Sequence, residues 1–167
     1  MRLSASVSSA SLVLSLIGGS VASPYTVFRA DSRTPGQIKR SGGFMSLGAT
    51  YGLGEDYSIT PIRHVGMDES DYNYRRDPWI STTADREYAI SHAKRRALGA
   101  TWHIYHISTS GLRLIDMKEE HQKAGESYRR AHEQEYLVPH RISWAHIDGW
   151  DVIDGSGKIT YVANNDR

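Results

Sequence analysis

The sequence contains no cysteine in its 167 residues. This absence excludes disulfide bonds, thiolate zinc sites and a cysteine nucleophile, and it leaves no residue through which a partner chain could be tethered by a disulfide. Phenylalanine is also scarce, with two residues, whereas ten tyrosines and four tryptophans supply most of the aromatic material. A domain of this length without disulfides must rely on its hydrophobic core for stability.

A large excess of charge of either sign is missing too. Lysine and arginine number 20 and aspartate and glutamate 19, and Arg2 is the one charged residue in the first 22 positions. The remainder of the chain is therefore formally neutral when histidine is neutral. No global basic field would draw such a protein onto nucleic acid, so we expect no nucleic-acid partner.

The apolar run at the N-terminus, "SLVLSLIGG", is too short to span a bilayer. It follows Arg2 and precedes small residues at Ser20 and Ala22, a pattern typical of a secretory signal peptide cut near Ala22. We therefore expect a secreted protein, without stable membrane insertion, whose residues 23–167 form a single domain. The alternative for residues 1–22 is a disordered, serine-rich tail.

Local signals predict a strand at 25–30 and then a helix. Thr34 can cap this helix, Pro35 suits its first position, and Gln37 completes a capping box with Thr34. Glycines at 42 and 43 end it. Residues 44–77 show no period and predict a long irregular stretch with one short helix at most.

The second half predicts more strands than helices. A strand ends in "PWISTT", and a helix then runs from about Ala84 to Leu98, capped by Thr82 or Thr83. Further strands are expected at 101–108, 112–117 and 133–140, with a loop or a marginal helix at 118–132 and a hairpin formed by 146–154 and 158–163. This order predicts an α+β fold with mixed or antiparallel sheets.

Two carboxylates stand close together near the end of the chain. Glu133 and Glu135 are two apart on a predicted strand, and alternation would put both on one face. Like charges at that spacing repel, which favours either a functional pair or a solvated face. The residues alone leave both interpretations open.

Other candidates are Arg29, three consecutive hydroxyls and two histidines. Arg29 either pairs with Asp31 or presents its guanidinium to a phosphate. One hydroxyl among Ser81 and the two following threonines suffices for a helix cap, which leaves two for another task. His103 and His106 are three apart on a strand, point to opposite faces and cannot bind one metal together, so no metal site is expected.

Three blocks in order, "VFRADSRTPGQIKRSGGF", "ISTT" and "EQEYL", resemble the Arg–Ser–Glu class of ADP-ribosyltransferases. The first block is similar to the A chain of cholera toxin and heat-labile enterotoxin over some eighteen residues. The second matches the Ser-Thr-Ser motif of that class except that Thr83 replaces the final serine, and the third matches its Glu-x-Glu motif. "HRISWAHIDGW" also resembles the segment after that motif in those toxins, so the likeness runs from about Tyr25 to Trp150.

The resemblance implies a secreted, toxin-like mono-ADP-ribosyltransferase with an NAD-binding cleft between mixed or antiparallel sheets. It implies transfer of ADP-ribose from NAD⁺ to an arginine of a target protein, with NAD⁺ hydrolysis as a side activity. Glu135 would be the catalytic glutamate, Ser81 would orient it, Glu133 would act on the acceptor, and His64, seventeen residues before Ser81, would be the active-site histidine. The residues implied in NAD⁺ binding are Arg29, Ala30, Asp31, Ser32, Arg33, Gly43 and Thr82.

Two other functions compete with this one. A catalytically weak or dead relative could bind a host protein as a secreted effector, although intact Arg29, Ser81 and both glutamates favour an enzyme. Family members that modify guanine in DNA carry glutamine where this chain has Glu133, which favours a protein arginine as acceptor. The toxins also join a receptor-binding pentamer through a disulfide-linked segment, and the lack of cysteine argues against delivery by that route.

Overall fold

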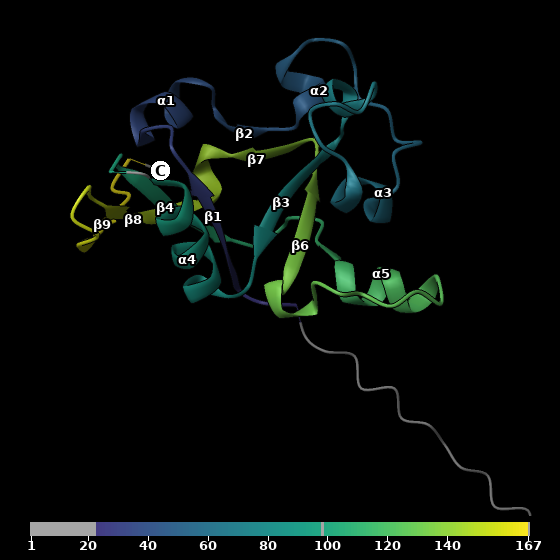
Figure 1. Ribbon diagram of the computed structural model, residues 1–167. Helices are drawn as coiled ribbons and strands as arrows, with labels where there is room; N and C mark the ends of the chain where they lie inside the picture. The colour runs from purple at the N-terminus through teal and green to yellow at the C-terminus, as the bar shows by residue number, and fades with distance from the viewer. Residues whose placement is uncertain (1–22, 98, 167) are drawn as a thin grey trace, which may run out of the picture.

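The computed structural model describes residues 23–97 and 99–166, and the expected α+β class is confirmed (Figure 1). The predicted signal peptide lies outside the described residues. A seven-stranded antiparallel sheet has the order β5-β6-β3-β1-β4-β8-β9. Its strands are β1 (Thr26–Asp31), β3 (Trp79–Thr83), β4 (Trp102–Ser108), β5 (Ile115–Asp116), β6 (Glu135–Pro139), β8 (Ile147–Ile153) and β9 (Ile159–Ala163).

A smaller sheet and several helices complete the fold. β2 (Gly43–Met45) and β7 (Arg141–Ser143) form an antiparallel pair. The helices are α1 (Pro35–Arg40), α2 (Leu47–Thr50), α3 (Pro61–Gly66), α4 (Arg86–Ala97) and α5 (Met117–Lys123), with 3₁₀ turns η1 (Tyr74–Arg76), η2 (Ala131–Glu133) and η3 (Trp144–His146). None of the helices among the described residues is long and apolar enough to cross a membrane.

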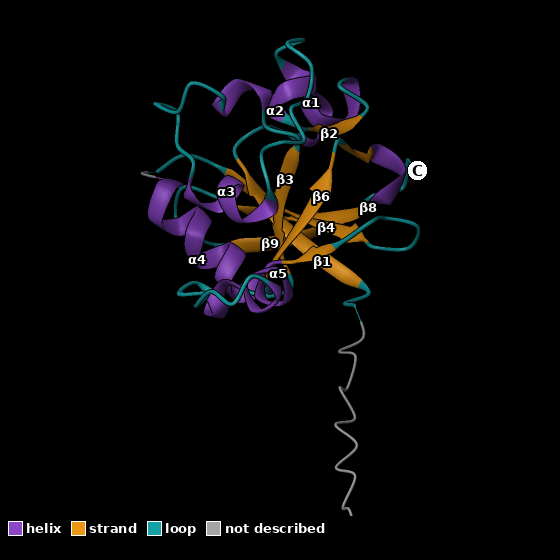
Figure 2. Ribbon diagram, turned by 90° about the vertical axis from the view of Figure 1, so that its right-hand side faces the viewer, coloured by secondary structure: helices purple, strands orange, loops and turns teal. Residues whose placement is uncertain are grey.

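The large sheet packs against other elements on both of its faces. On one face α4 presents Ala89 and Ala93, four residues apart as the sequence predicts, to Ile104 of β4. The next strand residue, Tyr105, points to the opposite face, where it packs with Phe44 of β2. A third cluster lies under α3 and α5 and contains Ile59, Trp79, Met117 and Leu137. Figure 2 shows the helices arranged around the strands.

The sheet divides between β1 and β3. β1 pairs with β4 over its whole length, from Thr26 opposite Ser108 to Asp31 opposite His103. Within the described strands, β1 and β3 pair at one position, Phe28 opposite Thr83. The two strands then diverge as a V in Figure 1. The sheet therefore has two halves that meet at one end and open at the other.

The capping box predicted for α1 is confirmed. Thr34 accepts from the Gln37 backbone N–H, and Gln37 Oε1 accepts from the Thr34 backbone N–H at 2.7 Å. The expected cap of α4 is wrong, because that helix begins at Arg86 and Asp85 Oδ1 accepts from the Tyr88 N–H at 3.0 Å. The expected end at Leu98 lies outside the described residues.

The two threonines hold strands together instead of capping α4. Thr82 Oγ1 donates to the Tyr136 carbonyl at 2.7 Å, and Thr83 Oγ1 donates to the Glu133 carbonyl at 2.6 Å. The first bond joins β3 to β6, and the second joins β3 to the η2 turn that leads into β6. The local sequence does not distinguish a hydroxyl that joins two strands from one that caps a helix, because the partner carbonyls lie some fifty residues away.

Residues 44–77 are more regular than expected. They contain β2, α2, α3 and η1, and Ser46 and Thr60 cap the two helices through their side chains. Each element is too short to produce a detectable period. In 118–132 the helical alternative holds for the first part, as α5, while the strand expected at 112–117 shortens to β5. The predicted β8–β9 hairpin is confirmed.

Candidate active site

A pocket of about 450 Å³ opens where β1 and β3 diverge beside α4. This volume lies in the range of small-molecule binding sites. β1 and its following residue, β3, α4, β4 and the η2 turn all contribute side chains to it. The lining residues are Phe28, Arg29, Ala30, Asp31, Ser32, Ser81, Thr82, Thr83, Tyr88, Ala89, His92, Arg96, Trp102, Arg130, Glu133 and Glu135.

Arg29 bridges the divided sheet. Its NH1 group donates to the Ser81 carbonyl of β3 at 2.7 Å, and its guanidinium carbon lies 5.3 Å from the centre of the Phe44 ring. Its Nε group is buried and has no hydrogen-bond partner among the described residues, and it lies 3.7 Å from Asp31 Oδ2. Burial lowers the pKa of Arg29, although the Asp31 charge opposes this. A half-buried cation with an unpaired donor suits an anionic ligand group.

Asp31 is held by a second arginine. Arg33 donates from Nε to Oδ1 at 2.9 Å and from NH2 to Oδ2 at 2.7 Å, a bidentate pair. Burial would raise the pKa of Asp31, but the bonds from Arg33 and the charge of Arg29 outweigh it and hold this pKa below its usual value. The sequence left open whether Asp31 pairs with Arg29; the structure gives Asp31 its direct hydrogen bonds from Arg33.

Three polar side chains form a hydrogen-bonded chain that ends on β3: Asp77, His64 and Ser81. His64 of α3 lies with Nε2 2.8 Å from Ser81 Oγ and with Nδ1 2.6 Å from Asp77 Oδ2. Asp77 is buried and also accepts from the Trp79 N–H through Oδ1 at 3.2 Å. The hydroxyl of Ser81 is thus fixed by His64, and His64 is fixed by Asp77.

Glu133 and Glu135 do not share a strand, so that prediction is wrong. Glu133 ends the 3₁₀ turn η2, Gln134 adopts a left-handed backbone with φ 44°, and Glu135 begins β6. The left-handed residue breaks the alternation that the sequence argument assumed. Both glutamates nevertheless line the pocket, because the turn folds Glu133 back towards it.

Each glutamate has a tyrosine beside it. Tyr128 donates its hydroxyl to Glu135 Oε2 at 3.0 Å. Burial, reinforced by the Glu135 charge, raises the pKa of Tyr128 above its ordinary value, and burial together with neighbouring Glu133 raises that of Tyr88. Ser81 and Glu135 lie on the same face of paired strands, since Ser81 opposes Leu137 and Thr83 opposes Glu135.

The sequence-predicted site residues separate into two groups. The pocket brings together Arg29, Ala30, Asp31, Ser32, Ser81, Thr82, Glu133 and Glu135. The remaining three predicted residues are absent from its described lining: His64 contacts Ser81 from behind, Arg33 holds Asp31, and Gly43 is buried in β2 against β7.

Several site residues escaped the sequence argument. The side chains that belong to no motif and reach the site through tertiary contacts are Asp77, Tyr88, His92, Trp102, Tyr128 and the cations Arg96 and Arg130. Burial lowers the pKa of His92, and the charges of Arg96 and Arg95 lower it further. The described residues hold no group of three or more histidine, aspartate or glutamate side chains able to bind a metal ion.

The arrangement is suited to a ligand that is anionic in one part and develops positive charge in another. Arg29 offers a guanidinium for phosphate, whereas Glu133 and Glu135 offer carboxylates for a cationic centre. Glu133 and Glu135 are only half-buried, so a second reactant can reach their carboxylates from solvent.

Comparison with known proteins places this geometry in a family. The family model of the heat-labile enterotoxin alpha chain matches residues 9–166. A curated relative, the NAD(+)–arginine ADP-ribosyltransferase Chelt of Vibrio cholerae, is 27% identical over 129 residues, which are 76% of this chain and 21% of the relative. The chain thus spans about a fifth of the length of that relative.

Solved structures agree with the family match. A double mutant of heat-labile enterotoxin is 25% identical with a TM-score of 0.64, over 83% of this chain and 62% of that chain. A guanine-specific ADP-ribosyltransferase shares the fold alone, with a TM-score of 0.58 at 18% identity over 87% of this chain and 79% of that one. Because the enterotoxin model spans nearly the whole sequence and the motif residues meet in one pocket, the chain belongs to the heat-labile enterotoxin alpha chain family.

Proposed function

We propose that this protein is a mono-ADP-ribosyltransferase that cleaves NAD⁺ and transfers ADP-ribose to an arginine of a target protein. The observation that carries the proposal is the meeting of Arg29, Ser81, Glu133 and Glu135 in one pocket of an enterotoxin-family chain. The curated relative from Vibrio cholerae carries that activity in its name. NAD⁺ is the substrate, and release of nicotinamide accompanies the transfer.

The pocket fits NAD⁺ in its charges and donors. The dinucleotide carries a pyrophosphate, which suits the partly unpaired guanidinium of Arg29. Breaking the nicotinamide–ribose bond develops oxocarbenium character, as in glycoside cleavage. The Glu135 carboxylate stabilises that charge, and Ser81, held by His64, borders the same part of the pocket.

Glu133 is assigned to the acceptor. A guanidinium acceptor needs a carboxylate that positions it and takes its proton as the bond to ribose forms. Glu133 lies on the exposed η2 turn beside Glu135, where an arginine of another protein can reach it. This position favours arginine over guanine as acceptor, a choice that the shared fold alone does not make.

The test is an assay of the purified protein with labelled NAD⁺ and a guanidine acceptor. Nicotinamide release and labelled acceptor are measured for the wild type, for Glu135→Gln and for Glu126→Gln, an exposed control. Glu135→Gln should lower NAD⁺ cleavage at least about a hundredfold, because electrostatic stabilisation of the transition state is lost. Wild-type turnover in Glu135→Gln would contradict the assignment, and an inactive wild type would favour the alternative of a binding effector.

We further propose that residues 1–22 direct secretion and are removed after Ala22. Arg2, the apolar run and the small residues at 20 and 22 support this. N-terminal sequencing of the protein recovered from the medium of an expressing culture should begin at Ser23. A recovered protein that begins at Met1 would contradict it.

A further inference from the structure

Tyr128 makes a direct contact with the proposed catalytic glutamate. Its hydroxyl donates to Glu135 Oε2 at 3.0 Å, and in the described part of the chain this is the one hydrogen bond of that hydroxyl. Tyr128 lies in the polar stretch 118–132, to which the sequence assigned no function. Neither the motifs nor the family likeness assigns a role to this residue.

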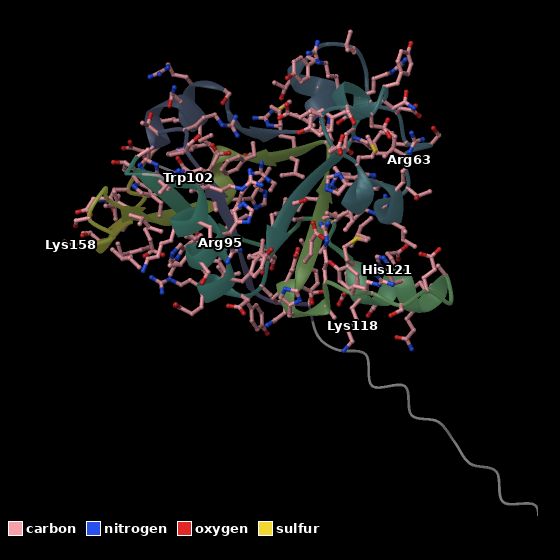
Figure 3. The ribbon with its side chains drawn as sticks, viewed as in Figure 1. Arg63, Arg95, Trp102, Lys118, His121 and Lys158 are labelled. Carbon is pink, nitrogen blue, oxygen red and sulfur yellow. The ribbon has the colours of Figure 1, made fainter. Side chains whose placement is uncertain are left out.

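The ring of Tyr128 is held independently of its hydroxyl. It stacks on the His121 ring with centroids 4.3 Å apart and planes 23° from parallel. His121 lies on α5 (Figure 3) and is buried. Its Nδ1 lies 2.8 Å from the Met117 carbonyl. Met117 is fully buried beside Leu137, two residues after Glu135 on β6. The helix therefore acts as a support between the strand and the tyrosine.

The phenol remains a donor at neutral pH. Burial raises the pKa of Tyr128, and the negative charge of Glu135 raises it further. A protonated hydroxyl can donate to a carboxylate oxygen, and a bond to a charged acceptor is stronger than a neutral one. Oε2 of Glu135 is thereby occupied, whereas Oε1 has no hydrogen-bond partner among the described residues and is available to substrate.

We propose that Tyr128 is a positioning residue, which fixes the rotation of the Glu135 carboxylate so that its second oxygen faces the ribose of NAD⁺. This rests on the proposed function of Glu135. Packing alone does not account for the hydroxyl, since a phenylalanine would fill the same space against His121. A carboxylate stabilises a developing positive charge better when its orientation is already fixed before the reaction.

Tyr128→Phe removes the hydroxyl and keeps the stacked ring. We expect kcat for NAD⁺ hydrolysis to fall about tenfold, the effect of one hydrogen bond to a charged group, while KM changes less than about twofold. Tyr136→Phe, at a half-buried tyrosine of β6 outside the pocket lining, is the matched control and should retain activity. An unchanged kcat in Tyr128→Phe would overturn the proposal.

A double-mutant cycle separates positioning from a general effect on structure. If Tyr128 acts through the Glu135 carboxylate, Tyr128→Phe should have no further effect on the residual hydrolysis of Glu135→Gln. A second tenfold loss in that background would show that the hydroxyl acts elsewhere, which overturns the proposal.

The two proposals fail in distinguishable ways. An active Glu135→Gln variant contradicts the proposed function of Glu135 and with it the role of Tyr128. An inactive Glu135→Gln variant with a fully active Tyr128→Phe variant contradicts the role of Tyr128 alone. Melting temperatures of all variants check that each protein is folded.

Discussion

His64 Nε2 lies 2.8 Å from Ser81 Oγ, and the Asp77 carboxylate binds the other nitrogen of the same ring at 2.6 Å. A carboxylate can only accept, so Nδ1 of His64 carries a proton, and in the neutral imidazole this leaves Nε2 as an acceptor. Nε2 is then the acceptor for the Ser81 hydroxyl. Asp77 in this way decides which direction the Ser81 proton points.

Asp77→Asn should move the imidazole proton of His64 from Nδ1 to Nε2. The Trp79 N–H needs an acceptor, so the amide oxygen stays there and the NH₂ group faces His64. The ring must then carry its proton on Nε2 and donate to Ser81. We expect NAD⁺ hydrolysis to fall about tenfold or more, and ¹⁵N NMR of the imidazole to report the changed tautomer. Asp68→Asn, at an exposed loop position, is the control; retention of the Nδ1–H form in Asp77→Asn would refute the argument.

Glu133→Gln should separate the two activities. Water needs less help than a guanidinium to reach the ribose, so hydrolysis should remain within about threefold of wild type while arginine labelling falls at least about tenfold. The Glu133 backbone carbonyl keeps its bond from Thr83 in this variant, so the turn is preserved. Nicotinamide release and acceptor labelling are measured side by side. If hydrolysis and arginine labelling fell by the same factor, the proposed role of Glu133 at the acceptor would be wrong.

His103 should make the protein less stable in mild acid. Burial lowers its pKa below 6.5, Asp31 opposes this in part, and its buried Nδ1 has no hydrogen-bond partner among the described residues. Below about pH 6.5 the unfolded chain therefore binds a proton at His103 that the folded chain does not bind. The free energy of unfolding then falls as the pH drops.

The test is the melting temperature between about pH 7 and pH 5. His103→Gln should flatten its decline with falling pH, whatever the absolute stability of the variant. His132→Gln, at an exposed histidine of η2, is the matched control and should leave the slope as in wild type. An unchanged slope in His103→Gln would show that another group causes the acid sensitivity.

Gly43→Ala should be strongly destabilising. The backbone of Gly43 has φ 122°, and a Cβ atom there would lie 2.0 Å from the Ile142 carbonyl of β7. Neither atom can move without separating the two strands, so we expect a loss above about 3 kcal/mol in urea unfolding, or no folded protein. Gly52→Ala has a positive φ of 65° but open space around it, and it should cost only about 1 kcal/mol. Similar losses in the two variants would refute the steric argument.

Much of the fold could be predicted because its signals are local. The Thr34–Gln37 capping box, the β-branched and aromatic run of 101–108 and the turn between β8 and β9 each depend on neighbours within a few residues. The short elements of 44–77 and the strand β7 could not be predicted, because elements of three to six residues show no period and are stabilised by contacts with distant segments.

The sequence by itself determined the chemical groups of the site and their order along the chain: Arg29, the hydroxyls at 81–83 and the two glutamates, with no cysteine available. Only the tertiary structure decided how those groups are used. The divergence of β1 from β3 opens the pocket, and a left-handed residue at 134 sets Glu133 on a turn. Distant side chains then fix Ser81 and Glu135, from Asp77 through His64 and from Tyr128. These contacts depend on strand pairing and packing between segments far apart in the chain, which no local pattern encodes.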